Sequence, residues 1–395
     1  MSNYEAIVAG HLCLDIIPDL SSIAPGRFFD LFRPGQLIQI GAATIATGGA
    51  VSNTGLALNK LGIHTRLIAK IGNDLFGQAV RQVICTFGAD LADGLIVAAG
   101  ESTSYTLIVS PPGIDRMFLH CVGANDSFAA GDIDWESAPD ARLFHLGYPP
   151  VLPRLYRYDG VQLAAAFYRA KSRSLTTSLD MSLPDPNSEA GKTFWPGVLS
   201  RSLRFVDLFL PSIEEILFML DRPAYERLKQ QADDGDILPL VTPDLLNETS
   251  AQLIRMGCKI VVLKLGNRGL YLRTADAGAI AGMGRAAPPD PERWANRELW
   301  SPCFQVNMVG ATGAGDATIA GFLAAFLRGL GPEEAINAAV AVGACNVEAA
   351  DALSGLRTWE ETLQRIASGW EKHSLSLDAP GWVFDETYRL WKKVV

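Results

Sequence analysis

Short apolar runs and an amphipathic stretch alternate through the second half of the chain. Segments typical of strands occur at 143–147, 175–180, 205–210 and 259–264, and residues 159–171 between the first two have helical spacing. Strands that alternate with helices in this way form a mostly parallel sheet with helices on both faces. The pattern therefore predicts an α/β fold.

The N-terminal part opens on a buried strand at 6–10, and residues 66–72 form a second apolar run. Ligands of parallel sheets bind beyond the carboxyl ends of the strands. Asp15 follows the first strand closely, so it is either a carboxylate that accepts hydrogen bonds from substrate hydroxyls or an ordinary turn aspartate.

A pair of glycines opens the first predicted helix. Gly48 and Gly49 precede the helical stretch, and Asn53 lies one turn into it. Paired glycines let a ligand approach the main chain closely. The Asn53 amide is placed to hydrogen-bond a hydroxyl group.

Two further segments predict a small second sheet. Residues 33–47 show partial strand alternation, and 101–122 contain a hairpin of strands 103–109 and 117–121 around Pro111-Pro112-Gly113. Such a sheet would act as a lid or as a dimer surface.

The stretch that says most about function is a glycine turn that leads into a helix. Gly313, Ala314 and Gly315 precede apolar residues at helical spacing, namely Ile319, Phe322, Leu323, Phe326 and Leu327. Backbone N–H groups at a helix N-terminus favour an anion. Asp316 at this point is either a helix cap or a general base beside an anion hole.

Two familiar phosphate motifs do not fit. Gly191-Lys192-Thr193 resembles the end of a P-loop, but Pro186 occupies the position of its first glycine. The glycines at 310, 313 and 315 have the reverse of dinucleotide-fingerprint spacing. A dinucleotide oxidoreductase is thereby disfavoured.

Composition narrows the class of protein. The chain has 395 residues, is 48% hydrophobic and carries a net charge of −9, which argues against nucleic-acid or membrane-surface partners. The six cysteines form no C-x-x-C pair, and no apolar run reaches 18 residues. We therefore expect scattered thiols in a reducing, cytoplasmic environment.

Taken together, the motifs resemble those of ribokinase-like sugar kinases of the PfkB family over roughly 4–355. The first motif joins Gly48-Gly49-Ala-x-x-Asn53 to Lys70-Ile-Gly72-x-Asp74-x-Phe-Gly77, and the second is Thr312-Gly-Ala-Gly-Asp316. Lys264-Leu-Gly266-x-x-Gly269 lies between them. The resemblance implies a ribokinase-like three-layer sandwich with a mostly parallel central sheet and a small β lid.

The resemblance also implies roles for individual residues. Asp316 would be the catalytic base, and the amides of Gly313, Ala314 and Gly315 the anion hole. The sugar would be held by Asp15, Gly48, Gly49 and Asn53. ATP would lie near Lys264, Gly266, Gly269, Ser212 and Asn346, with Glu215 linked to Mg²⁺.

The sequence departs from the family pattern at several positions. Gly310-Ala311 replaces the Asp-Thr pair of the monovalent-cation loop, so a K⁺ requirement stays open. Ser212 replaces the asparagine of the Asn-x-x-Glu motif. We expect an ATP-dependent carbohydrate kinase, with a nucleoside kinase, its aromatic floor at Phe118 or Tyr105, or a non-catalytic sensor of the same fold as alternatives.

The remaining segments define the expected domain organisation. A kinase domain would cover 1–366, with an inserted loop at 275–298, and residues 367–395 would be an aromatic-rich extension packed on it. The lid is a candidate homodimer contact.

Overall fold

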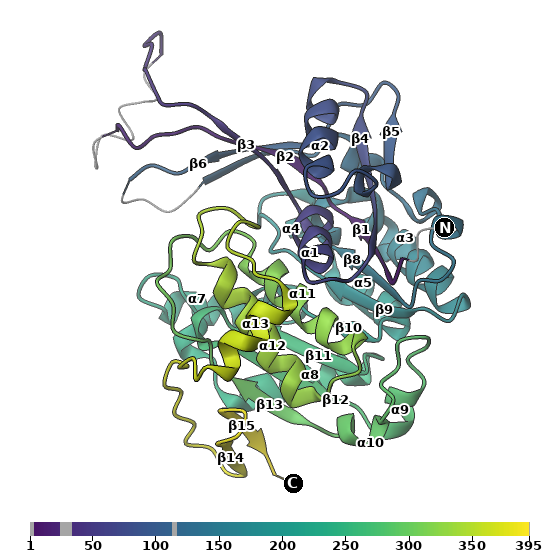
Figure 1. The fold of residues 1–395 in the computed structure, drawn as a ribbon, viewed down its shortest axis with the longest axis vertical. Helices are drawn as coiled ribbons and strands as arrows, with labels where there is room; N and C mark the ends of the chain where they lie inside the picture. Colours follow the sequence, from purple (N-terminus) through teal and green to yellow (C-terminus); the bar gives the residue numbers. More distant parts are fainter. Residues whose placement is uncertain (1–3, 24–33, 113–116, 395) are drawn as a thin grey trace.

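The structure, a computed structural model, describes residues 4–23, 34–112 and 117–394. Its centre is a large twisted sheet (Figure 1). The strands of this sheet are β1 (Ala6–Gly10), β4 (Thr65–Gly72), β5 (Leu95–Ala98), β8 (Leu143–Gly147), β9 (Thr176–Asp180), β10 (Leu208–Phe209), β11 (Ile260–Lys264), β12 (Leu270–Thr274), β13 (Glu298–Ser301), β14 (Trp382–Asp385) and β15 (Leu390–Lys393). Within the described ranges they lie in the order β14-β15-β13-β12-β11-β10-β9-β8-β1-β4-β5.

The strands from β11 to β5 in this order run parallel, and β12 to β15 pair antiparallel. Successive residues of a strand point to opposite faces of the sheet. Val8 of β1 accordingly joins one hydrophobic core cluster, and its neighbour Ile7 joins the other. The sheet is thus buried on both faces, as its continuous apolar runs predict.

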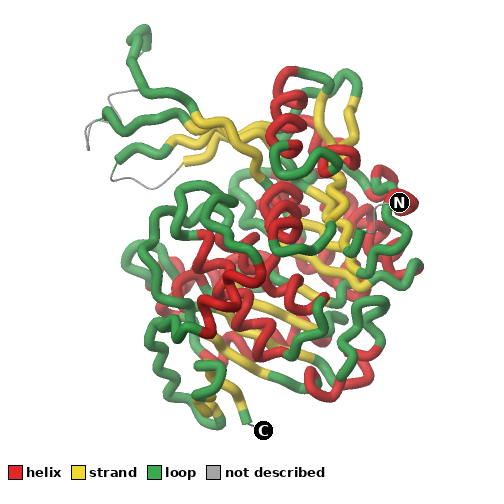
Figure 2. Tube along the Cα trace, in the orientation of Figure 1, coloured by secondary structure: helices red, strands yellow, loops and turns green. Residues whose placement is uncertain are grey.

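Helices cover both faces (Figure 2). Their bounds are α1 (Ala50–Lys60), α2 (Leu75–Cys85), α3 (Pro153–Ser172), α4 (Glu189–Lys192), α5 (Trp195–Ser202), α6 (Ile213–Leu220), α7 (Arg222–Gln231), α8 (Pro243–Arg255), α9 (Ala277–Ala281), α10 (Pro291–Trp294), α11 (Ala314–Leu327), α12 (Pro332–Asn346) and α13 (Trp359–Ala367). Side chains of α1, α11 and α12 fill one core cluster, and those of α3, α5, α6 and α8 fill the other. The predicted three-layer α/β fold is confirmed.

A second, four-stranded sheet projects from the body beside α1 and α2 (Figure 1). Its strands are β2 (Cys13–Ile17), β3 (Thr44–Gly48), β6 (Tyr105–Val109) and β7 (Met117–Cys121), in the order β3-β2-β6-β7 within the described residues. Strands β6 and β7 correspond to the hairpin strands that the sequence predicts at 103–109 and 117–121. Asp15 lies on β2, a strand that the sequence analysis did not anticipate.

The predicted strand at 33–47 is largely wrong. Residues 34–43 form no strand, and only β3 pairs with β2. Because β2 has five residues, it offers no partner to the residues before Thr44. Residue 33 and residues 113–116, which belong to the expected lid segments, lie outside the described residues.

The expected inserted loop at 275–298 is more ordered than predicted. It contains α9 and α10, and Trp294 at the end of α10 is almost completely buried. The indole contacts Phe322 and Phe326 of α11 with ring centroids 6.2 and 5.5 Å apart. Packing on α11, rather than local propensity, orders this segment.

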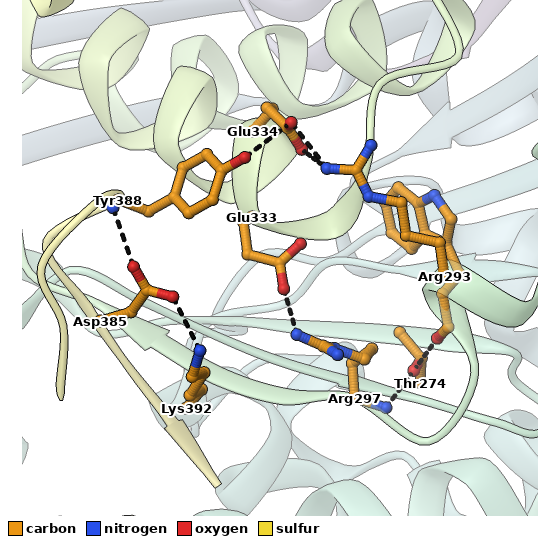
Figure 3. A network of polar contacts seen from close by, with 9 residues as sticks. Thr274, Arg293, Arg297, Glu333, Glu334, Asp385, Tyr388 and Lys392 are labelled. Carbon is orange, nitrogen blue, oxygen red and sulfur yellow. Dashed lines mark hydrogen bonds and ion pairs between the residues drawn. The ribbon is translucent and has the colours of Figure 1, made fainter. Parts of the chain in front are cut away.

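The C-terminal extension continues the main sheet. Strand β15 pairs with β13, and β14 pairs with β15. A polar contact joins the extension to α12, since Tyr388 donates a hydrogen bond to Glu334 at 2.9 Å (Figure 3). Arg293 of α10 contacts the same carboxylate at 2.6 Å. Asp385 and Lys392 form an ion pair between the two terminal strands at 2.8 Å.

Across the described ranges, none of the helices combines the length and the apolar character that a membrane crossing requires.

Candidate active site

Asp316 lies in the first turn of α11 and is almost completely buried. Its Oδ2 accepts a hydrogen bond from Asn53 Nδ2 at 3.0 Å, and its Oδ1 accepts one from Thr54 Oγ1 at 3.2 Å. The starts of α1 and α11 therefore meet at this carboxylate. Burial raises the pKa of Asp316, while the Asn53 amide and the Lys264 ammonium oppose the rise. A raised pKa suits a carboxylate to proton transfer near neutral pH.

Tyr148 is a site residue that the sequence analysis missed. Its hydroxyl donates to Asp316, 2.9 Å from Oδ1 and 2.8 Å from Oδ2. The backbone φ of Tyr148 is 63°, in the left-handed region, where strain often accompanies function. Tyr148 directly follows β8, the neighbour of β1, so the strand-end rule that selected Asp15 was the available signal.

Lys264 is the centre of a cluster of buried charges. Its Nζ lies 2.6 Å from Oδ1 of Asp180, whose side chain has no exposed surface. Burial alone would lower the pKa of Lys264, but the carboxylates of Asp180 and Glu215 outweigh it and raise the pKa. A Cβ placed on Gly315 would lie 3.7 Å from Nζ, so the ammonium stands beside the start of α11.

Glu215 closes a capping box at the start of α6. Its amide donates to Ser212 Oγ at 3.1 Å, and its Oε2 accepts from the Ser212 amide at 2.6 Å. Burial raises the pKa of Glu215. The Ser212 hydroxyl accepts a hydrogen bond as the helix cap and can still donate one, so its assignment as a nucleotide contact stays a prediction. Oε1 of Glu215 takes no part in the capping box.

The acid cluster fits a divalent cation. Asp180, Glu215 and Asp316 interact with one another and with the single ammonium of Lys264. Oδ2 of Asp180 is buried without a hydrogen-bond partner in the described chain. Buried polar atoms are rarely unpaired, and Mg²⁺ prefers carboxylate oxygens. Asp180 and Glu215 are therefore the residues best suited to hold Mg²⁺.

The glycine turn before α11 has the geometry of an anion site, with one qualification. Gly313 has φ 72°, and a Cβ there would lie 2.5 Å from Cβ of Ala352, so only glycine fits. The amide of Ala314 donates to Ala311 O at 3.3 Å, so one of the three expected donors is engaged within the turn. The helix N-terminus and the Lys264 ammonium still place positive charge at one point.

A pocket of about 420 Å³ opens next to this helix start. Lys264, Gly266 and Gly269 line it together with Ala314 and Gly315, so the predicted nucleotide-side residues come together. Its farther walls are mainly apolar, formed among others by Phe304, Val306, Met308, Val340 and Val347. A charged mouth with an apolar interior fits a phosphorylated molecule that carries a planar base.

Asn346 does not reach this pocket. It is completely buried, and its Nδ2 donates to Ala352 O at 2.6 Å. Its neighbour Val347 lines the pocket in its place, together with His373 of the C-terminal extension. We therefore do not retain Asn346 as a base contact.

The predicted acceptor-side residues lie around the start of α1, which contacts Asp316 through Asn53. Gly48 packs against the carboxylate of Asp15, and Gly49 with φ 91° packs against the His11 ring. Asn53 donates to Asp316, while its buried Oδ1 has no partner in the described chain. An acceptor oxygen free beside the carboxylate suits recognition of a hydroxyl group.

Known proteins resemble this chain over most of its length. The family model described as pfkB family carbohydrate kinase matches residues 6–359. A protein of Archaeoglobus fulgidus named an uncharacterized sugar kinase is 28% identical over 304 residues, covering 76% of this chain and 98% of its own. A nucleoside kinase of Methanothermobacter thermautotrophicus is 23% identical over 368 residues, covering 93% and 96%.

A solved kinase structure has a similar fold. Arabidopsis thaliana ribokinase in complex with ribose and ATP superposes with a TM-score of 0.67 at 18% identity, covering 92% of this chain and 98% of its own. Because the family match extends over nearly the whole described body, the chain belongs to the PfkB family of carbohydrate kinases.

Proposed function

We propose that this protein transfers the terminal phosphoryl group of ATP to a hydroxyl group of a sugar, with Asp316 as the general base. One observation carries the proposal: the Asp316 carboxylate interacts with residues of both predicted sides of the reaction. Asn53 donates a hydrogen bond to it, and the charge of Lys264, which also lines the pocket at the start of α11, lowers its pKa. The nucleotide complex of the ribokinase relative supports ATP as the donor.

In this mechanism Asp316 accepts the proton of the attacking hydroxyl as its oxygen forms a bond to the γ-phosphorus. The bond from that phosphorus to the β-phosphate oxygen breaks, and ADP leaves with the bonding electrons. Lys264 and the N-terminus of α11 stabilise the charge on the moving group. Mg²⁺, when bound at Asp180 and Glu215, would neutralise charge on the phosphate oxygens.

The small sheet is suited to cover the acceptor side. Strand β2 carries Asp15, and β3 ends at Gly48. Closure would exclude water and suppress hydrolysis of ATP. Ile45, Met117 and Leu119 are exposed on this lid, which supports its use as a homodimer contact.

A screen for ADP release tests the function directly. Purified protein with Mg²⁺ and ATP would be offered pentoses, hexoses and nucleosides, and ³¹P NMR would identify the phosphorylated product. We expect a sugar to accelerate ADP release well above the rate with water alone. Acceptor binding in a thermal-shift assay without turnover on any compound would instead indicate a sensor.

A nucleoside is the second candidate acceptor, because rings line the acceptor side. His11 stacks on Tyr148 with centroids 6.2 Å apart and contacts His120 edge-on at 5.2 Å. Such a wall can pack against a base. The nucleoside kinase relative supports this alternative, and the nucleoside arm of the screen separates it from a sugar kinase.

Glu215→Gln should raise the Mg²⁺ concentration needed for half-maximal activity about tenfold or more, because a metal ligand loses its charge. Glutamine retains the oxygen that caps α6, so the helix start should persist. The measurement is ADP release across a Mg²⁺ titration. Glu214→Gln is the matched control, since Glu214 lies in the same turn but pairs with Lys229. Identical titrations for the two variants would exclude Glu215 from the metal site.

Tyr148→Phe should move the acidic limb of the kcat–pH profile to higher pH. The Tyr148 hydroxyl donates to the Asp316 carboxylate and thereby lowers its pKa. Without that donor the base is protonated at higher pH, so activity falls off earlier on acidification. Tyr168→Phe, at an exposed tyrosine of α3, should reproduce the wild-type profile. A profile unchanged in Tyr148→Phe would show that the hydrogen bond does not persist during turnover.

A further inference from the structure

His11 is a buried imidazole to which no described residue gives a hydrogen bond. It follows β1 directly, its side chain is only 6% exposed, and neither ring nitrogen finds a partner within the described chain. Buried polar side chains are normally paired, so this one needs an explanation. Ring stacking on Tyr148 satisfies its faces but not its nitrogens.

Two further donor atoms lie next to His11. The Cys13 thiol, also buried, contacts Asp15 Oδ1 at 3.3 Å, and His120 approaches from strand β7 of the lid. A ring nitrogen of each histidine and Sγ of Cys13 all lie within 4.8 Å of one another. Thr106 Oγ1 touches two of these groups, at 3.5 Å from Cys13 Sγ and 3.0 Å from His120 Nδ1.

We propose that His11, Cys13 and His120 form a binding site for Zn²⁺ or a cation of similar softness. Two imidazoles and one thiolate are a ligand set that zinc binds tetrahedrally, with the fourth position left to water or a small ligand. Bonds of about 2.0–2.3 Å place neighbouring ligand atoms roughly 3.3–3.8 Å apart, so the three groups need to close by at most about 1.5 Å. His120 is exposed on the lid, which gives it room to make this adjustment.

This site differs in chemistry from the acid cluster around Lys264. Carboxylates select hard cations such as Mg²⁺, whereas thiolate and imidazole select zinc and its neighbours. Binding at Cys13 releases the thiol proton, so the site should lose affinity as pH falls. The bound ion would tie β7 of the lid to Cys13 at the start of β2 and to His11 in the connection before it, beside Tyr148.

Cobalt(II) provides a direct probe, because a cobalt–thiolate bond has its own charge-transfer absorption. Reduced, chelator-treated full-length protein would be titrated with Co²⁺ in the absence of nucleotide. We expect about one equivalent to produce the charge-transfer band, and added Zn²⁺ to abolish it. The acid cluster contains no thiol and contributes no such band, and the readout is independent of kinase activity.

Matched variants assign the band to these residues. Cys13→Ser should abolish it, Cys85→Ser at an exposed thiol should retain it, and His120→Ala should weaken Co²⁺ affinity at least tenfold. Circular dichroism would establish that each variant is folded. Absence of the band in folded wild-type protein, its survival in Cys13→Ser, or unchanged affinity in His120→Ala would each overturn the proposal.

Hydrogen exchange tests the effect on the lid. Zn²⁺ should slow amide exchange in β7 of the wild-type protein and leave it unchanged in His120→Ala. Equal slowing in both proteins would show that the ion does not bridge β7.

Discussion

Asp316→Asn is expected to lower kcat by roughly 10²- to 10⁴-fold, the usual contribution of a positioned general base. Asparagine nearly matches aspartate in shape but cannot take the proton of the attacking hydroxyl. Lys264 and the pocket beyond it are untouched, so affinity for ATP should change only a few-fold. The measurements are steady-state phosphorylation of the acceptor found in the screen and calorimetric binding of a non-hydrolysable ATP analogue with Mg²⁺.

Asp276→Asn is the matched control for this variant. Asp276 also stands at a helix start, but it caps α9 by accepting from Ala279 N at 3.0 Å. It should retain wild-type turnover. Turnover of Asp316→Asn within tenfold of the wild type would refute the assignment of Asp316 as the base, whatever its effect on binding.

Lys264→Met is expected to lower the free energy of unfolding by about 3–5 kcal/mol, the usual cost of stranding one partner of a buried ion pair. Asp180 has no exposed surface and keeps its carboxylate beside Glu215 when the ammonium is removed. The measurement is urea unfolding of the protein without nucleotide or divalent cation. Lys259→Met, at a half-buried lysine just before β11, should cost less than about 1 kcal/mol.

The double variant Lys264→Met/Asp180→Asn separates this effect from lost packing. Removing the stranded charge should recover more than half of the loss, because the pair is coupled. If the double variant is as unstable as Lys264→Met, the cost comes from the lysine stem. A single variant as stable as the wild type would indicate that Asp180 is already neutral in the folded protein.

The sequence predicts the body of this fold because its strongest signals are local. A buried strand such as β1 is a continuous apolar run, and α11 has helical apolar spacing after a glycine turn. Each of these patterns indicates one type of secondary structure. The family motifs then ordered the elements, which neither run length nor periodicity does.

The predictions from sequence fail where tertiary contacts determine whether a segment is ordered. Leu37 and Ile40 look like strand residues, yet they are exposed in a segment that has no partner strand. Trp294 sits among prolines and charges that suggest a loop, but its burial against α11 orders the segment. A strand pattern needs a neighbour, and the sequence of one segment does not reveal whether a neighbour exists.

In the candidate site, too, residues marked by local sequence signals were predicted, and residues that depend on tertiary contacts were missed. Asp316 and Asn53 were selected from glycine-rich helix starts, and the structure brings them within 3.0 Å. Tyr148 and Asp180 also lie at strand ends, but the local sequence does not reveal that Tyr148 reaches Asp316 or that Asp180 pairs with a lysine 84 positions away. Ser212 and Asn346 were assigned by motif position, whereas their side chains serve helix capping and a buried turn.

The terminal hairpin has a consequence for self-association. Strand β13 carries the fully buried Trp300, and β15 pairs with its outer side, Trp391 opposite Trp300. An uncovered apolar edge strand is a template on which another molecule can add its own strand. The edge that remains is the four-residue β14, which ends in the charged Asp385. The hairpin thus replaces the edge at β13 with a strand of four residues, and so short an edge offers few unpaired backbone groups to a strand of another molecule.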